Sequence, residues 1–133
     1  MKAEQRLDLT SLQRALDSLH RALQEPKNEF VRDSAIQRFE YTYELSWKFL
    51  KRYLEQDEGI ENVDGLHRKD LFRLAAEKGL IVDPSEWFEF HLARNQTTQT
   101  YSEAKADEVY EATKTFLPRA QQLLQELTRR CHD

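Results

Sequence analysis

The sequence predicts an all-α protein, built as an up-and-down bundle of four to five helices. Good helix formers (Leu, Glu, Arg, Lys, Ala and Gln) fill most of the 133 residues. Three glycines and three prolines are few for such a chain, and apolar residues recur at the spacing of a helix face. We expect one domain over residues 1–133, because this length is usual for a single domain and is long enough to bury a core.

The first helix is indicated by five leucines between positions 9 and 23, which are spaced alternately three and four residues apart. We expect it to stop at Pro26, because proline breaks the hydrogen bonding of a helix interior. A second helix begins near Asn28, whose side chain is a favourable N-cap, and runs to about Gln56.

The second helix has an unusually wide apolar arc. One stripe holds Ile36, Phe39, Tyr43, Trp47, Leu50 and Leu54. The arc is extended sideways by Ala35, Phe49 and Tyr53. A helix that is apolar over so much of its circumference is either central in a bundle or shared with a second subunit.

A short third helix is predicted over residues 66–78 and is closed by Gly79, a residue that readily takes the left-handed conformation at a helix end. The chain then restarts a helix in a recognisable way. Asp83 is the predicted N-cap and Pro84 suits the first helical position. We expect this fourth helix to run from Pro84 past Arg94.

The last helix should start near Ser102 and be long and amphipathic. Its apolar stripe consists of Val109, Thr113, Phe116, Ala120, Leu123 and Leu127. Pro118 lies inside this pattern, and we expect a kink there or a break just before it.

Composition excludes several classes of function. The formal net charge is -4, so the chain does not resemble a protein that holds long nucleic acid through its phosphates, and any RNA contact must be local. The single cysteine, Cys131, rules out an intrachain disulfide and a cysteine-based metal site. The chain lacks the apolar stretch of a signal peptide or of a membrane span. We therefore expect a soluble, cytoplasmic protein with no membrane contact.

The segment "RNQTTQTY" at 94–101 stands out, because the run from Asn95 to Ser102 carries no charge in a chain where 33% of residues are charged. Threonine and asparagine lower helix propensity, so the helix should loosen here. Chemistry alone favours an ordinary junction with Arg94 in an ion pair. His91, on the preceding helix, is more typical of a structural hydrogen-bonding residue than of a catalyst.

Two longer stretches carry a family resemblance: "EFVRDSAIQRFEYTYELSWKFLKRYLE" at 29–55 and "WFEFHLARNQTTQTYSEAKADEVYE" at 87–111. Both resemble the nucleotidyltransferase substrate-binding protein family, a branch of the HEPN superfamily of small helical bundles. The resemblance implies a HEPN-like fold, a homodimer formed with the help of the second helix, and a complex with a minimal nucleotidyltransferase encoded nearby.

The resemblance also gives the junction a meaning. In many HEPN proteins an Arg-Asn-x-x-x-His-x-Tyr motif forms a metal-independent RNase site across the dimer, and the partner nucleotidyltransferase can transfer AMP to the tyrosine. Arg94 and Asn95 match the start of this motif and Tyr101 matches its end. Gln99 stands at the position of the histidine, and an amide cannot exchange a proton near neutral pH. His91 lies on the wrong side of Arg94 to replace it.

Two functions follow from the resemblance. The favoured one is a non-catalytic, dimeric binding partner of a minimal nucleotidyltransferase in a two-component, toxin-antitoxin-like system, with Tyr101 as the candidate adenylylation site. The alternative is a HEPN-type endoribonuclease toxin using Arg94 and Asn95, neutralised by adenylylation of Tyr101; the loss of the histidine at Gln99 counts against it. In both cases we expect no cofactor of the chain's own, since ATP and Mg²⁺ would belong to the partner, and a local contact with RNA or nucleotide.

Overall fold

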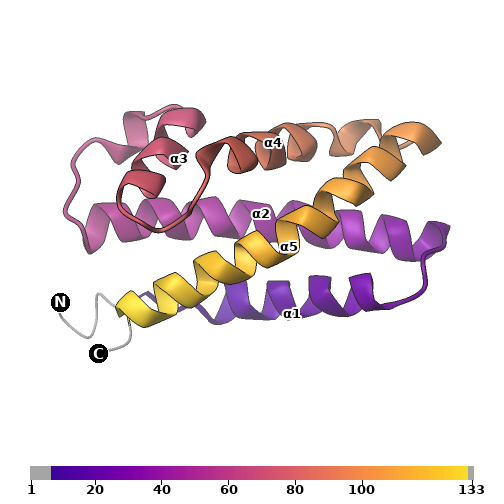
Figure 1. Cartoon of the computed structure of the whole chain (residues 1–133), viewed down its shortest axis with the longest axis horizontal. Coiled ribbons are helices and arrows are strands. Elements are labelled where there is room, and N and C mark those ends of the chain that lie inside the picture. The colour runs from indigo at the N-terminus through magenta and orange to yellow at the C-terminus, as the bar shows by residue number, and fades with distance from the viewer. Residues whose placement is uncertain (1–6, 132–133) are drawn as a thin grey trace.

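The computed structural model describes residues 7–131, and within them the chain forms five α-helices and two short 3₁₀ turns, with no strand (Figure 1). The helices are α1 (Thr10–Gln24), α2 (Glu29–Gln56), α3 (Arg68–Glu77), α4 (Pro84–Asn95) and α5 (Glu103–Cys131). The 3₁₀ turns are η2 (Val63–Gly65) and η3 (Thr97–Gln99). The predicted all-α bundle is confirmed. None of the described helices combines the length and apolar composition that a membrane span needs.

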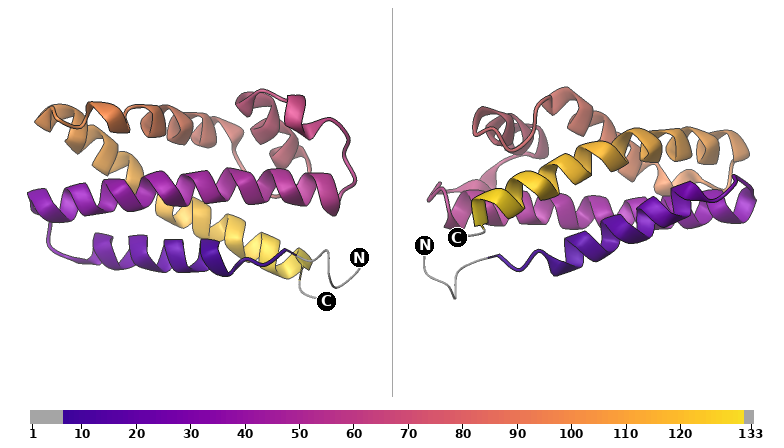
Figure 2. Two further views of the ribbon diagram at one scale, coloured as in Figure 1. Left: turned by 180° about the vertical axis from the view of Figure 1, so that it is seen from behind. Right: turned by 60° about the horizontal axis from the view of Figure 1, so that its bottom comes forward.

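Helix α2 is the central element of the bundle. It lies between α1 on one side and α3 with α4 on the other, and α5 crosses it obliquely (Figures 1 and 2). Ala35, Phe49 and Tyr53 are buried within this single chain. The wide apolar arc is therefore explained by the central position of α2 and does not itself require a second subunit. Among its apolar side chains, Phe30 and Tyr41 remain exposed.

Aromatic rings from three helices form the middle of the core. The ring centroid of Phe116 on α5 lies 5.0 Å from that of Phe39, 5.2 Å from Phe90 and 5.8 Å from Trp87. All four side chains are buried. All three ring contacts have the edge-to-face geometry that aromatic pairs favour. This cluster fixes α4 and α5 against α2 and so positions the junction between them.

The helix ends follow the chemistry that the sequence predicted. The Asn28 side chain accepts a hydrogen bond of 2.8 Å from the backbone N–H of Val31, and Asp83 accepts one of 2.9 Å from the N–H of Ser85. Gly79 has a φ of +78°, a conformation that glycine adopts without strain. These local signals place the ends of α2, α3 and α4 within one or two residues of the prediction.

Helix α5 runs through Pro118 without interruption. Of the two outcomes that the sequence allowed there, a kink or a break, the break does not occur. Proline removes one N–H, which leaves the carbonyl of Lys114 without its helical partner. Both residues are exposed, and solvent can satisfy that carbonyl. The helix therefore tolerates proline on its outer face.

Candidate functional site at the junction of α4 and α5

The uncharged segment loosens the helix where the sequence predicted. Between α4 and α5 the chain makes only the 3₁₀ turn η3 and a short bend. The Thr97 hydroxyl donates to the backbone oxygen of Arg94 at 2.8 Å, and the Thr100 hydroxyl donates to that of Thr97 at 3.1 Å. Thr97 thus binds a carbonyl in the last turn of α4, and Thr100 binds one within η3.

Arg94 is held by two carboxylates of α2. Its Nε lies 3.1 Å from Glu44 Oε1, and its Nη1 lies 3.7 Å from Glu40 Oε2. The Thr97 hydroxyl oxygen also lies 2.7 Å from the same Glu40 oxygen, so its single proton is shared between that carboxylate and the Arg94 carbonyl. The Trp47 indole N–H donates to the second Glu44 oxygen at 3.1 Å. The predicted ion pair of Arg94 is confirmed. An incoming phosphate has to compete with these carboxylates for the guanidinium.

The other motif residues face solvent. Asn95 and Gln99 are exposed, and the Tyr101 side chain is 88% exposed. Among residues 7–131, no side-chain hydrogen bond joins Gln99 or Tyr101 to another residue. The structure therefore places Arg94 and Asn95 on one turn of α4 and leaves the Tyr101 hydroxyl free on the surface.

His91 belongs to a hydrogen-bonded cluster that sequence reasoning missed. Its Nδ1 lies 2.8 Å from the hydroxyl of Tyr43, and Arg68 donates to the same hydroxyl at 2.9 Å. Because Arg68 donates to the Tyr43 oxygen, we assign the phenol proton to the bond with His91 Nδ1 and the imidazole proton to Nε2. The side-chain amide of Asn95 lies 3.5 Å from that Nε2. His91 is a structural hydrogen-bonding residue, as predicted, and it also reaches the motif.

The surroundings of this cluster keep both rings neutral near pH 7. Burial lowers the pKa of His91 below its ordinary value of 6.5, and the positive charge of Arg68 lowers it further. Burial raises the pKa of Tyr43 to about 12. The hydrogen bond between His91 and Tyr43 therefore joins two uncharged side chains at physiological pH.

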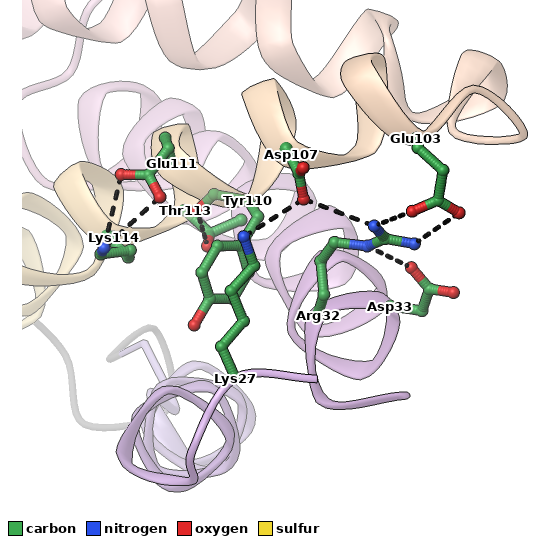
Figure 3. A network of polar contacts seen from close by, with 9 residues as sticks. All are labelled: Lys27, Arg32, Asp33, Glu103, Asp107, Tyr110, Glu111, Thr113 and Lys114. Atoms are coloured by element: carbon green, nitrogen blue, oxygen red, sulfur yellow. Dashed lines mark hydrogen bonds and ion pairs between the residues drawn. The ribbon is translucent and has the colours of Figure 1, made fainter. Parts of the chain in front are cut away.

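A second polar network anchors the start of α5, two residues after Tyr101 (Figure 3). The Arg32 side chain, only 6% exposed, lies on α2 and points toward α5. Its nitrogens lie 2.5 Å from Glu103, 3.0 Å from Asp33 and 3.4 Å from Asp107. The Arg32 guanidinium holds the pKa of Glu103 below its ordinary value. This network fixes the far end of the junction in the same way as Glu44 fixes the near end.

A metal site is not formed by the residues that the structure describes: no group of three or more His, Cys, Asp or Glu side chains among them is placed to hold an ion. That ATP and Mg²⁺ belong to a partner stays a prediction.

Comparison with known proteins decides the family. Residues 7–129 match the family described as "nucleotidyltransferase substrate binding protein like". The chain belongs to this family. The match includes α1 to α4, α5 up to residue 129 and the motif at 94–101, so the resemblance carried by two stretches of sequence extends over nearly the whole chain.

Proteins of known structure are similar to this chain over most of its length. A structure from Haemophilus influenzae, described as revealing the fold of a substrate binding domain of a nucleotidyltransferase, superimposes with a TM-score of 0.83 at 34% identity, covering 90% of this chain and 98% of that one. A crystal structure of a Thermus thermophilus protein superimposes with a TM-score of 0.78 at 34% identity, covering 87% and 98%.

A curated relative of this family member carries a functional name. The probable ribonuclease HepT of Haemophilus influenzae is 41% identical over 97 residues, which are 72% of this chain. The match spans 66% of the length of that relative.

Proposed function

We propose that this family member is a non-catalytic, dimeric binding partner of a minimal nucleotidyltransferase in a two-component, toxin-antitoxin-like system, and that Tyr101 accepts AMP from that partner. The observation that carries the proposal is the Tyr101 side chain, which is 88% exposed on a short turn at the end of the motif. A hydroxyl in this position can enter the active site of another protein.

The acceptor chemistry needs only a reachable phenol on this chain. The Tyr101 oxygen attacks the α-phosphorus of ATP and forms an O–P bond, the bond to the bridging oxygen breaks, and pyrophosphate leaves. The phenol proton passes to a base of the partner, which also supplies Mg²⁺. Tyr43 and Tyr110 are buried, so neither offers its oxygen to a partner in the folded state.

Two observations argue against ribonuclease activity. Gln99 occupies the histidine position of the motif, and its amide cannot take the proton of a ribose 2′-hydroxyl. Arg94, the residue that would hold the scissile phosphate, is engaged by Glu44 and Glu40. The proton-transfer step and the phosphate-binding step are therefore both weakened.

The alternative function is a metal-independent endoribonuclease toxin that adenylylation of Tyr101 neutralises. The relative named probable ribonuclease HepT supports it, as do Arg94 and Asn95 at their motif positions. Under this alternative, the ion pairs of Arg94 with Glu44 and Glu40 break when RNA binds. Cleavage assays, described in the Discussion, separate the two functions.

Self-association completes the proposal. In the family that the sequence resembles, the second helix takes part in a homodimer. Phe30, near the start of α2, is 81% exposed, and burying such a side chain against a second copy is favourable. The proposed dimer therefore buries surface side chains such as Phe30 and is not needed to complete the core of each bundle.

Complex formation is tested by light scattering coupled to size exclusion. The full chain should elute with the mass of a dimer at micromolar concentration. After mixing with a minimal nucleotidyltransferase from the same genome, both proteins should elute together at a larger mass. A monomer alone and two separate peaks after mixing would contradict the proposal.

A further inference from the structure

We propose that a cavity between α2, α3 and α4 binds a nucleoside monophosphate, with the phosphate on Arg68 and the base against an apolar wall. The cavity has a volume of about 270 Å³. Its polar lining includes Lys51, Arg68 and His91, and its apolar lining includes Trp47, Val63 and Leu71. This cavity, which we call the Arg68 pocket, lies apart from Tyr101 and has no role in the acceptor chemistry above.

Arg68 is a fixed cation without a carboxylate partner. Its guanidinium carbon lies 3.8 Å from the ring centroid of Trp47, and one of its nitrogens donates to the Tyr43 hydroxyl at 2.9 Å. No Asp or Glu among residues 7–131 forms an ion pair with it. Stacking on an indole orients the guanidinium while most of its N–H groups stay available, which is the arrangement that binds phosphate in proteins.

The charge of the lining selects a ligand of low charge. Lys51 lies at the same cavity but is ion-paired with Asp64. Arg68 and Lys51 against Asp64 leave one positive charge in excess. A monophosphate ester carries about 1.5 to 2 negative charges at pH 7, of which this excess neutralises one. A triphosphate or an RNA strand would bring several more charges that the pocket does not neutralise.

The remaining walls suit a flat, weakly polar ring. The apolar surface open to a ligand comes mainly from Leu66, which is 38% exposed, and from the Trp47 ring. Val63 and Leu71 lie behind them and are almost fully buried. The volume of about 270 Å³ lies just below the usual range of about 300–1,000 Å³ for small-molecule sites, so the cavity admits one small ligand. A phosphate anchor beside an apolar wall of this size fits a mononucleotide better than an inorganic anion.

The Arg68 pocket is connected to the motif through single side chains. The Trp47 indole N–H and the Arg94 guanidinium both bind Glu44, one on each oxygen. On the other wall, His91 contacts Asn95 at 3.5 Å. A ligand in the pocket is therefore separated from Asn95 by His91 alone, and from Arg94 by Trp47 and Glu44.

Calorimetric titration of AMP into the full chain, without a nucleotidyltransferase, tests the pocket. We expect saturable binding of one AMP per chain and weaker binding of inorganic phosphate. Arg68→Gln should weaken AMP binding about tenfold or more, the size expected for a charge-assisted contact. Arg73→Gln is the matched control, because Arg73 lies on the same helix, is exposed and pairs with Asp70; it should bind AMP like the wild type.

Three results would overturn the pocket: no saturable binding at millimolar AMP, equal weakening by the two arginine substitutions, or binding of inorganic phosphate as tight as that of AMP. If Arg68→Gln does not fold, NMR of the wild type replaces it. AMP should then shift the indole N–H signal of Trp47 and the ring signals of His91, and shifts confined to other residues would also overturn the pocket.

The pocket and the acceptor proposal are tested independently. Tyr101→Phe should bind AMP with unchanged affinity, because the tyrosine does not line the pocket. Conversely, absence of AMP transfer to Tyr101 leaves the calorimetric result unaffected. A loss of AMP binding in Tyr101→Phe would contradict the placement of the ligand at Arg68.

Discussion

Arg94 on α4 and Glu44 on α2 form an ion pair in which Nε lies 3.1 Å from Oε1, although the two residues are 50 positions apart in the chain. The pair joins the motif to the central helix of the bundle. It also occupies the guanidinium that a HEPN ribonuclease would use for phosphate. The site is therefore better arranged to hold the junction in place than to bind a scissile phosphate.

Restoring the missing histidine should create ribonuclease activity. Gln99 is exposed on η3, so Gln99→His can be accommodated without repacking. We expect the wild type to show no cleavage of single-stranded RNA above the uncatalysed background. Gln99→His should cleave it roughly 10²-fold above that background, the usual contribution of a general base. A fluorescent RNA substrate measures both. The gain should vanish when Arg94→Ala is added, and a wild type as fast as Gln99→His would favour the ribonuclease function.

Removing Arg32 should loosen the start of α5. Arg32→Ala leaves Glu103 and Asp107 without their buried cation and removes a packed side chain, so we expect a loss of about 1–3 kcal/mol in the free energy of unfolding. Urea unfolding measures the loss, and hydrogen exchange should rise first in the opening turn of α5. Arg129→Ala removes an exposed arginine from the other end of the same helix and should change stability little. Equal effects of the two substitutions would refute the anchoring role of Arg32.

Removing the Phe116 ring from the centre of the core should destabilise the folded chain strongly. Phe116 is fully buried and contacts aromatic rings of α2 and α4. Phe116→Ala should lower the free energy of unfolding by about 3–5 kcal/mol, because it removes a large apolar side chain and leaves a cavity. Val82→Ala, at a side chain that is 85% exposed, is the control and should be nearly neutral. Similar unfolding midpoints for the two variants would contradict the described core.

The cluster around His91 should make stability depend on pH. Because the pKa of His91 is lowered in the folded chain, the unfolded chain binds the proton first as pH falls. The contribution of His91 to stability is therefore complete above its ordinary pKa of 6.5 and declines as pH drops from that value toward the folded pKa. His91→Gln should flatten this decline between about pH 7 and pH 5. Urea midpoints at several pH values measure it, and parallel curves for the two proteins would show that His91 is not linked to folding.

Much of the fold follows from local chemistry in the sequence. Leucine spacing predicts α1, and Asn28, Gly79 and Asp83 predict helix ends, because capping and backbone conformation act over a few residues. The packing of α2 against four other helices was not predictable in the same way. The width of its apolar arc allowed either a central helix or a dimer face, and only the tertiary structure distinguishes them.

The candidate site was predictable in part. The segment at 94–101 identified the junction and its motif residues, but the partners of Arg94 and His91 on α2 lie 48 to 54 residues earlier in the chain. Periodicity places a residue on a helix face and does not say which residue of another helix it meets. Arg32 did give a usable signal, since it lies four residues before the buried Ile36 on the apolar stripe, where a cation needs a partner.

The central claim is that Tyr101 accepts AMP, and intact mass spectrometry tests it most directly. The full chain is incubated with a minimal nucleotidyltransferase from the same genome, ATP and Mg²⁺. Tyr41→Phe is the matched control, because Tyr41 is also partly exposed but lies on α2, away from the motif. We expect a mass increase of one AMP in the wild type and in Tyr41→Phe, and none in Tyr101→Phe. An unmodified wild type, or an adduct that persists in Tyr101→Phe, would contradict it.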